Sequence, residues 1–364
     1  MTIRERIIAM FNGEMPDQMP WFADLTYWIA GQRQNGTYPR EYEGDEGYLK
    51  LHRDLGVGIY LFPPSVYYGK RDEAQFQSSH KKEDDLDIHE IHTPEGTLRT
   101  VRRYCPISTS SAPVEYAVKT PDDLRALRCF ISAETIHSSF DNFKRIDELW
   151  GEHGIPVLLP PRTPLARLTV EWAGITNLAF LVADYPEDVE ETLQTIAQKE
   201  DEIYETICRS PAYVVEFPDN LSAETAGGLF KRYSAKYYVK RIKQLHEAGK
   251  VVGVHLDGTM RGLITELANT SLDFIESITP EPVGDVPVEE LRTFVPEKTV
   301  LWGGVPGAMF APPFTWDDLK KHVEKIVACH SDSGRFILAS ADQVPPNGNI
   351  DFVRRISDML DLKE

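Results

Sequence analysis

The chain has 364 residues, of which 41% are hydrophobic and 26% are charged, the balance of a soluble globular protein. Its formal net charge of −18 at pH 7 argues against non-specific binding to nucleic acid or to an anionic membrane surface. No stretch approaches the ~20 apolar residues of a membrane span, and the four cysteines form no CxxC pair. We therefore expect a cytoplasmic protein with neither a nucleic-acid nor a membrane partner.

Short apolar runs that recur along the chain predict its strands. Before the first of them, residues 3–11 have the apolar spacing of a helix and not the pattern of a signal peptide. Most of the runs are apolar throughout, which is typical of parallel strands covered on both faces. The eight expected strands span residues 19–24, 57–62, 156–161, 213–218, 251–256, 274–279, 299–303 and 335–341.

Amphipathic helical stretches separate most of these strands. One is expected to begin at Pro186, with acidic residues in its first turn, and another follows Ser234 and ends near Gly249. Eight strands with intervening helices predict an α/β protein with a (β/α)8 TIM barrel, although a doubly wound sheet shares the alternation. We expect residues 1–364 to form a single barrel domain.

Residues 67–140 break this rhythm after the second expected strand. Within them, residues 88–104 have a Pro-Glu-Gly centre between β-rich arms, which predicts a hairpin. We expect this segment to be a hairpin-containing insertion that packs over the mouth of the barrel.

The sequence VVGVHLDG, residues 251–258, brings a histidine and an aspartate to the end of an apolar strand. Alternation along a strand puts His255 and Asp257 on the same side. Alone, this pattern is more typical of a core histidine and a helix-capping aspartate. The same arrangement recurs at other strand ends, where Glu216 and Glu276 interrupt apolar runs and need a cation, a hydrogen-bond partner or a substrate.

In a barrel, the carboxyl ends of the strands surround one cavity. The polar side chains expected there are Asp24, Arg162, Glu216, Asp219, Asn220, His255, Asp257, Glu276 and Asp342. Such a cluster predicts a shared active site. Motifs for a P-loop, a dinucleotide fold or a serine nucleophile elbow are absent from the sequence.

Several segments together resemble the uroporphyrinogen decarboxylase superfamily. They read RERIIAMFNGEMPDQMPWF at 4–22, EFPDNLSAETAGGLF at 216–230, VVGVHLDG at 251–258, LDFIESITPEPVGDVPVEELR at 272–292 and LWGGV at 301–305. The resemblance runs almost from end to end and implies a (β/α)8 barrel, in agreement with the strand count.

Three departures separate this chain from the true decarboxylases of that superfamily. Their arginine-rich segment after the first strand is missing, although Arg33 and Arg40 are present. Residues 62–65 read FPPS where those enzymes carry an aspartate, and Ser340, Ala341 and Asp342 replace a histidine-glycine pair. The chain is therefore closer to the corrinoid-linked methyltransferases of the superfamily.

The resemblance to that branch implies a metal site with altered ligands. Thiol-methylating members hold zinc through an HxCG motif and a further cysteine, and here the motif reads His255-Leu256-Asp257-Gly258. A zinc ion held by carboxylate oxygens and an imidazole, rather than by thiolates, suits a substrate that binds through oxygen better than one that binds through a thiol. We expect metal-assisted transfer of a methyl group from a small methoxy donor to the corrinoid of a partner protein, by a chain that itself can form a homodimer.

The roles expected from this comparison fall into three groups. The catalytic residues are His255, Asp219 and Asp257; the substrate-binding residues are Asp24, Arg162, Asn220 and Asp342; the zinc ligands are His255, Glu216, Asp257 and Glu276. The alternative is a metal-free decarboxylase or lyase, in which Asp219 and His255 handle protons and Arg162 holds a substrate carboxylate. A non-catalytic binding protein on the same barrel is the third reading.

Overall fold

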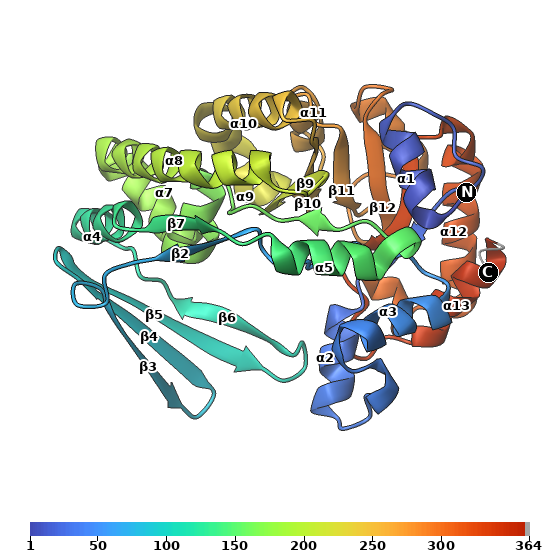
Figure 1. Cartoon of the computed structure of the whole chain (residues 1–364), viewed down its shortest axis with the longest axis horizontal. Helices are drawn as coiled ribbons and strands as arrows, with labels where there is room; N and C mark the ends of the chain where they lie inside the picture. Colours follow the sequence, from blue (N-terminus) through green and yellow to red (C-terminus); the bar gives the residue numbers. More distant parts are fainter. Residues whose placement is uncertain (361–364) are drawn as a thin grey trace.

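A parallel sheet of seven strands forms the centre of the protein. The computed structural model describes residues 1–360 (Figure 1). In spatial order the strands are β1 (Trp21–Phe22), β13 (Phe336–Ala341), β12 (Val300–Pro306), β11 (Phe274–Ile278), β10 (Val251–Leu256), β9 (Val214–Leu221) and β8 (Val157–Leu158). All neighbours pair in parallel. The sheet curls, and α helices cover its outer face.

The expected second strand, residues 57–62, makes isolated bridges and no ladder. The Gly58 N–H donates to the Trp21 carbonyl at 2.9 Å, and the Val157 N–H donates to the Tyr60 carbonyl at 2.9 Å. The segment therefore links the two edge strands, β1 and β8. It ends early because Phe62 has a φ of 60° and the two prolines that follow have no N–H to donate. Seven strands and one bridged segment thus replace the eight expected strands.

Helices follow most strands of the parallel sheet. Those around it are α1 (Ile3–Phe11), α2 (Thr26–Gln34), α3 (Gly44–Leu55), α5 (Asp141–Trp150), α6 (Pro164–Arg167), α7 (Gly174–Asp184), α8 (Pro186–Arg209), α9 (Ala223–Leu229), α10 (Ala235–Glu247), α11 (Leu263–Ala268), α12 (Trp316–His330) and α13 (Ile350–Met359). The helices expected at residue 3, at Pro186 and after Ser234 are confirmed.

The segment between the bridged residues and β8 forms two antiparallel sheets. One pairs β2 (Tyr67–Lys70) with β7 (Thr135–Ser138), and the other has the order β3 (Gln77–Glu83), β4 (Leu86–Thr93), β5 (Gly96–Cys105) and β6 (Ser110–Glu115). The expected hairpin is confirmed as β4 and β5. The four-stranded sheet projects away from the parallel sheet, with α4 (Pro121–Ser132) against it (Figure 1).

The helical run Pro164–Asp184 departs from the expectation that no segment is apolar enough to span a membrane. It has 21 residues, and a window of 18 of them has a mean hydropathy of 1.2, which by length and composition alone would suffice to span a membrane. One face of it packs inside the protein, where Leu178 and Leu181 join a core with Leu193 and Ile196 of α8. The run therefore contributes to a core layer between α4, α7 and α8.

Candidate active site

Alternate residues of the central strands point into the interior of the curled sheet. Aromatic rings form the layer beneath the site, with the Tyr60 and Trp302 ring centroids 4.7 Å apart and those of Phe274 and Trp302 5.7 Å apart. Gly253 permits this packing, because a Cβ at that position would lie 2.2 Å from the Phe274 ring. The next interior position on the same strand is His255, directly above the aromatic layer.

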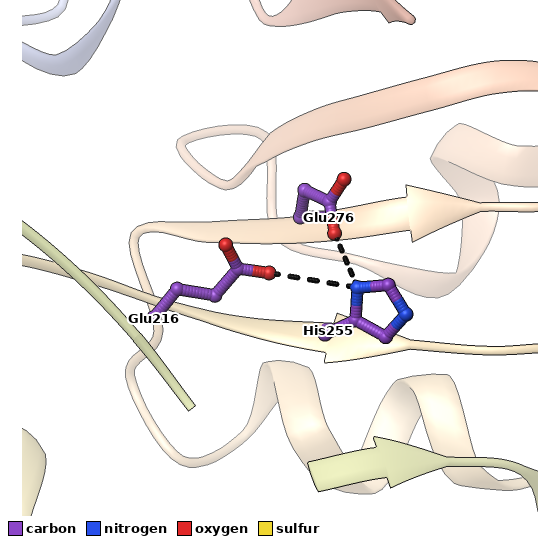
Figure 2. A group of neighbouring side chains, drawn as sticks. All are labelled: Glu216, His255 and Glu276. Atoms are coloured by element: carbon purple, nitrogen blue, oxygen red, sulfur yellow. Dashed lines mark hydrogen bonds and ion pairs between the residues drawn. The ribbon is translucent and has the colours of Figure 1, made fainter. Parts of the chain in front are cut away.

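Glu216 on β9, His255 on β10 and Glu276 on β11 meet above that layer (Figure 2). Nδ1 of His255 lies 2.6 Å from Oε2 of Glu276 and 3.8 Å from Oε1 of Glu216. One ligand atom from each residue lies within 4.8 Å of the others. In Figure 2 both carboxylates approach the Nδ1 edge of the ring, and Nε2 points away from them.

The two glutamates are buried, and their hydrogen bonding differs. Both carboxylate oxygens of Glu276 have a hydrogen-bond partner. The Tyr60 hydroxyl donates to Oε1 at 2.8 Å, and Nδ1 of His255 contacts Oε2. Neither oxygen of Glu216 has a hydrogen-bond partner among the described residues. Burial and the neighbouring Glu276 carboxylate raise the pKa of Glu216 well above its usual range. Glu216 is therefore a buried carboxyl group without a hydrogen-bond partner among the described residues, and its ion-pair contact with His255 is long, at 3.8 Å.

His255 and Glu276 stabilise each other's charged form. Burial opposes the charge on His255, but the adjacent carboxylate of Glu276, aided by Asp257 and Asp342, raises the pKa of His255 to about 9. Burial likewise opposes the charge on Glu276, yet His255 and the hydrogen bonds to this carboxylate hold the pKa of Glu276 below its usual range. Both shifts favour the form of the pair in which His255 is protonated and Glu276 is ionised.

A cavity of about 420 Å³ extends from this cluster to the surface. The residues that line it are Asp24, Tyr27, Leu61, Phe62, Leu159, Arg162, Glu216, Pro218, Asn220, His255, Asp342 and Gln343. All four expected substrate-binding residues are among them. Together they surround His255 and Glu216 with acidic groups, one arginine, one asparagine and several apolar side chains.

The two aspartates of the cavity stand on neighbouring strands. Asp24, after β1, accepts hydrogen bonds from the N–H and hydroxyl of Thr26, at 2.8 and 2.7 Å. The backbone N–H of Asp342, after β13, donates to the Ser277 hydroxyl at 2.7 Å. Burial is the largest cause that raises the pKa of Asp24 to about 7 and that of Asp342 to about 6. Both groups are poised to exchange a proton near neutral pH.

Asp219 does not line the cavity. Its two oxygens accept hydrogen bonds from the N–H and hydroxyl of Thr163 and from the hydroxyl of Tyr238. Strand alternation explains this, because Pro218 and Asn220 share the interior side with Glu216 and Asp219 points the other way. The structure thus gives Asp219 a place in the contact between the strands and α10, rather than the expected place beside the reacting groups.

Asp257 lies outside the group of three possible metal ligands found among residues 1–360. Strand β10 ends at Leu256, so the alternation that was expected to align Asp257 with His255 no longer applies. The Asp257 N–H instead donates to the Leu221 carbonyl at 2.7 Å. Of the four expected ligands, the structure brings together Glu216, His255 and Glu276 as a group that could hold a metal ion. Tyr60, which orients Glu276, was missed because it lies in an otherwise apolar run.

Comparison with known proteins identifies the family to which the chain is related. Residues 165–361, more than half of the chain, match the family Uroporphyrinogen decarboxylase (URO-D). The chain belongs to the URO-D family. The match contains β9 to β13 and so all three members of the glutamate-histidine cluster. A search of curated proteins gives no match.

Solved structures share the fold of this URO-D family member. One of them, a methyltransferase from Methanosarcina mazei, is 14% identical in sequence, with a TM-score of 0.61. The match covers 99% of this chain and 98% of that chain. The similarity in fold therefore extends over essentially the whole of both chains.

Proposed function

We propose that this protein is a metal-assisted methyltransferase that moves a methyl group from an oxygen-linked methoxy substrate to the corrinoid of a partner protein. The observation that carries the proposal is Glu216, whose two buried carboxylate oxygens have no hydrogen-bond partner among the described residues. A carboxyl group left in this state is costly unless a cation completes its surroundings.

The donor set fits a zinc ion. One imidazole nitrogen and two carboxylates, with their ligand atoms within 4.8 Å of one another, match the three protein ligands of catalytic zinc sites. Tyr60 holds Glu276 from behind, as outer hydrogen bonds commonly orient metal-binding carboxylates. A bound zinc ion would supply Lewis-acid polarisation of the ether oxygen, which makes that oxygen a better leaving group.

The remaining cavity residues bind and orient the substrate in this proposal. Asp24 and Asp342 lie on the side of β1 and β13, and Arg162 and Asn220 on the side of β8 and β9. In this proposal Asp24 or Asp342, which both line the cavity, supplies a proton to the oxygen that loses its methyl group. We further propose that residues 57–62 complete an eight-stranded barrel, with residues 67–140 as an insertion in a single domain.

The methyltransferase branch of the family is favoured by two observations. The Methanosarcina mazei protein with this fold is named a methyltransferase. In addition, the three residues that could hold a metal ion, Glu216, His255 and Glu276, offer oxygen and nitrogen donors, which suit an oxygen substrate better than a thiol. A cytoplasmic corrinoid protein is the partner that this chemistry requires.

The experiment is a methyl-transfer assay. Zinc-loaded protein is mixed with a reduced corrinoid protein and a panel of aryl methyl ethers, and methylcobalamin is followed by its absorbance. We expect methylcobalamin and the demethylated phenol in equal amounts, and none with His255→Ala, provided that variant keeps its circular dichroism spectrum. Equal rates for wild type and His255→Ala would overturn the proposal.

A metal-free carboxy-lyase is the second candidate, and one contact favours it. Nδ1 of His255 is paired with Glu276 at 2.6 Å, while Nε2 has no partner among residues 1–360. A histidine oriented in this way can carry a proton on its free nitrogen. Release of CO₂ from a carboxylated substrate by metal-free protein, without methyl transfer, would establish this activity instead.

A further inference from the structure

An exposed aromatic side chain stands in the wall of the cavity. Phe62 is 54% exposed and has a φ of 60°. A bulky residue rarely adopts a positive φ, since its side chain then crowds the backbone. Leu61 and Leu159, also in the cavity wall, make the same region apolar. Phe62 therefore contributes to the wall of the cavity, and other side chains leave about half of it uncovered.

Phe62 stands between the acidic and the basic sides of the cavity. The bridged segment that ends at Phe62 links β1, which precedes Asp24, to β8, which precedes Arg162. Asp342 follows β13, the other neighbour of β1, and Asn220 lies at the end of β9, the neighbour of β8. The cavity is thus polarised, with an apolar wall between its two ends.

The guanidinium of Arg162 has N–H donors that other side chains do not use, and its positive charge is only partly balanced by a nearby carboxylate. Nη2 donates to Oδ1 of Asn220 at 2.9 Å, and Asn220 is uncharged. The carboxylate nearest to Arg162 is Glu171, at 3.5 Å from Nη1, and Glu171 also pairs with Arg167 at 3.4 Å. Each terminal nitrogen of Arg162 carries a second N–H that has no hydrogen-bond partner among residues 1–360. Two such donors in one plane match the two oxygens of a carboxylate.

We propose that the cavity binds a flat, apolar ligand that ends in a carboxylate. Arg162 binds the carboxylate, Asn220 fixes the guanidinium by accepting from Nη2, and the ring of the ligand packs against Phe62. The other end of the ligand then lies toward His255 and the acidic side. The identity of the reacting group at that end rests on the proposed function, whereas the carboxylate site rests on Arg162 and Phe62 alone.

The test is direct binding by isothermal titration calorimetry, without a corrinoid partner or turnover. The probes are 4-methoxybenzoate, the uncharged 4-methoxybenzyl alcohol and the cationic 4-methoxybenzylamine. We expect 4-methoxybenzoate to bind most tightly to the wild type. Arg162→Met is expected to weaken it about 30-fold, the loss typical of a charge-assisted hydrogen-bonded pair, and to change the alcohol less than about twofold. Arg162→Lys keeps the positive charge but lacks the planar guanidinium. Its affinity for 4-methoxybenzoate is expected to lie between those of the wild type and Arg162→Met.

Controls separate recognition from folding. Arg232, which pairs with Glu190 at 2.9 Å on the surface, gives the matched variant Arg232→Met, for which unchanged binding is expected. Phe62→Ala is expected to weaken the benzoate and the alcohol alike, because both present the same ring. Variants are compared only after their thermal unfolding midpoints are shown to match the wild type.

Two results would overturn the inference. One is 4-methoxybenzoate that binds Arg162→Met as tightly as the wild type, and the other is tighter wild-type binding of the amine than of the benzoate. If the benzoate binds through Arg162 but no methyl group reaches a corrinoid, the proposed function fails and the carboxylate site stands. If methyl ethers without a carboxylate are demethylated as fast as the benzoate, the proposed function stands and the carboxylate site fails.

Discussion

His255 and Glu276 are direct partners in the parallel pairing of β10 with β11, and their side chains meet at 2.6 Å. The pairing register therefore sets this contact, because both residues occupy interior positions at the same level of the sheet. Glu216 stands one strand further along, on β9, and completes the cluster. Three adjacent strands thus determine the geometry of the candidate metal site.

Tyr60 is expected to support that site from outside. In Tyr60→Phe, the hydrogen bond to Oε1 of Glu276 is lost while the ring remains in the aromatic layer. We expect zinc affinity to fall about 10-fold, as when other hydrogen bonds that orient a metal ligand are lost, with little change in fold. Competition with a fluorescent zinc chelator measures the affinity. Tyr68→Phe, at an exposed residue of β2, is the control and should have no effect. Unchanged zinc affinity in Tyr60→Phe would remove Tyr60 from the site.

Asp219 is expected to stabilise the fold rather than the reaction. Asp219→Ala leaves the N–H and hydroxyl of Thr163 and the hydroxyl of Tyr238 without their acceptor. Unsatisfied buried donors lower the free energy of unfolding, here by about 2–4 kcal/mol. Urea denaturation checks this, and zinc affinity should stay within about twofold. The opposite pattern, intact stability with lost zinc binding, would restore the catalytic role expected from the sequence.

Glu200 is expected to make stability depend on pH. This carboxyl group on α8 is buried, and burial raises its pKa to about 8, against the partial compensation of Arg167 and the Tyr237 hydroxyl. The pKa of Glu200 is about 4.5 in the unfolded chain and about 8 in the folded protein, so the folded state holds its proton more tightly. The free energy of unfolding that this difference contributes is fully present below pH 4.5 and is lost as the pH rises to about 8.

Glu200→Gln isolates this contribution, because the amide resembles the protonated carboxyl group. Between pH 5 and 8 the wild type should lose stability relative to the variant by up to about 1.4 kcal/mol per pH unit. Chemical denaturation at several pH values measures the difference. Glu205→Gln, at an exposed position of the same helix, should follow the wild type. Parallel pH profiles for Glu200→Gln and the wild type would contradict the shifted pKa.

The sequence was most informative where local pattern and tertiary structure agree. The β-branched run at Val251–Leu256 forms a strand with the expected bounds. The expectation that the carboxyl ends of barrel strands surround one cavity was sufficient to predict that Glu216, His255 and Glu276 lie together. Strand alternation counted from Glu216 places Asp219 on the opposite side, so the local pattern contains the signal for its position away from the cavity.

Other features depend on contacts that no local pattern contains. Residues 57–62 look like a strand, but their pairing is limited by Phe62 and the prolines after it. Strand β3 is exposed along its whole length and carries no apolar alternation, so only the β4–β5 hairpin of its sheet was foreseen. The role of Tyr60 depends on a partner 216 residues away in the sequence.

The most direct test of the central claim is the zinc content of the purified protein after dialysis, measured by elemental analysis for the wild type and for Glu216→Gln. The amide keeps the size of Glu216 but removes a negative ligand, and the variant should keep the wild-type circular dichroism spectrum. The account predicts one zinc per wild-type chain and less than about one tenth of that in Glu216→Gln. No zinc in the wild type, or equal zinc in both proteins, would contradict it.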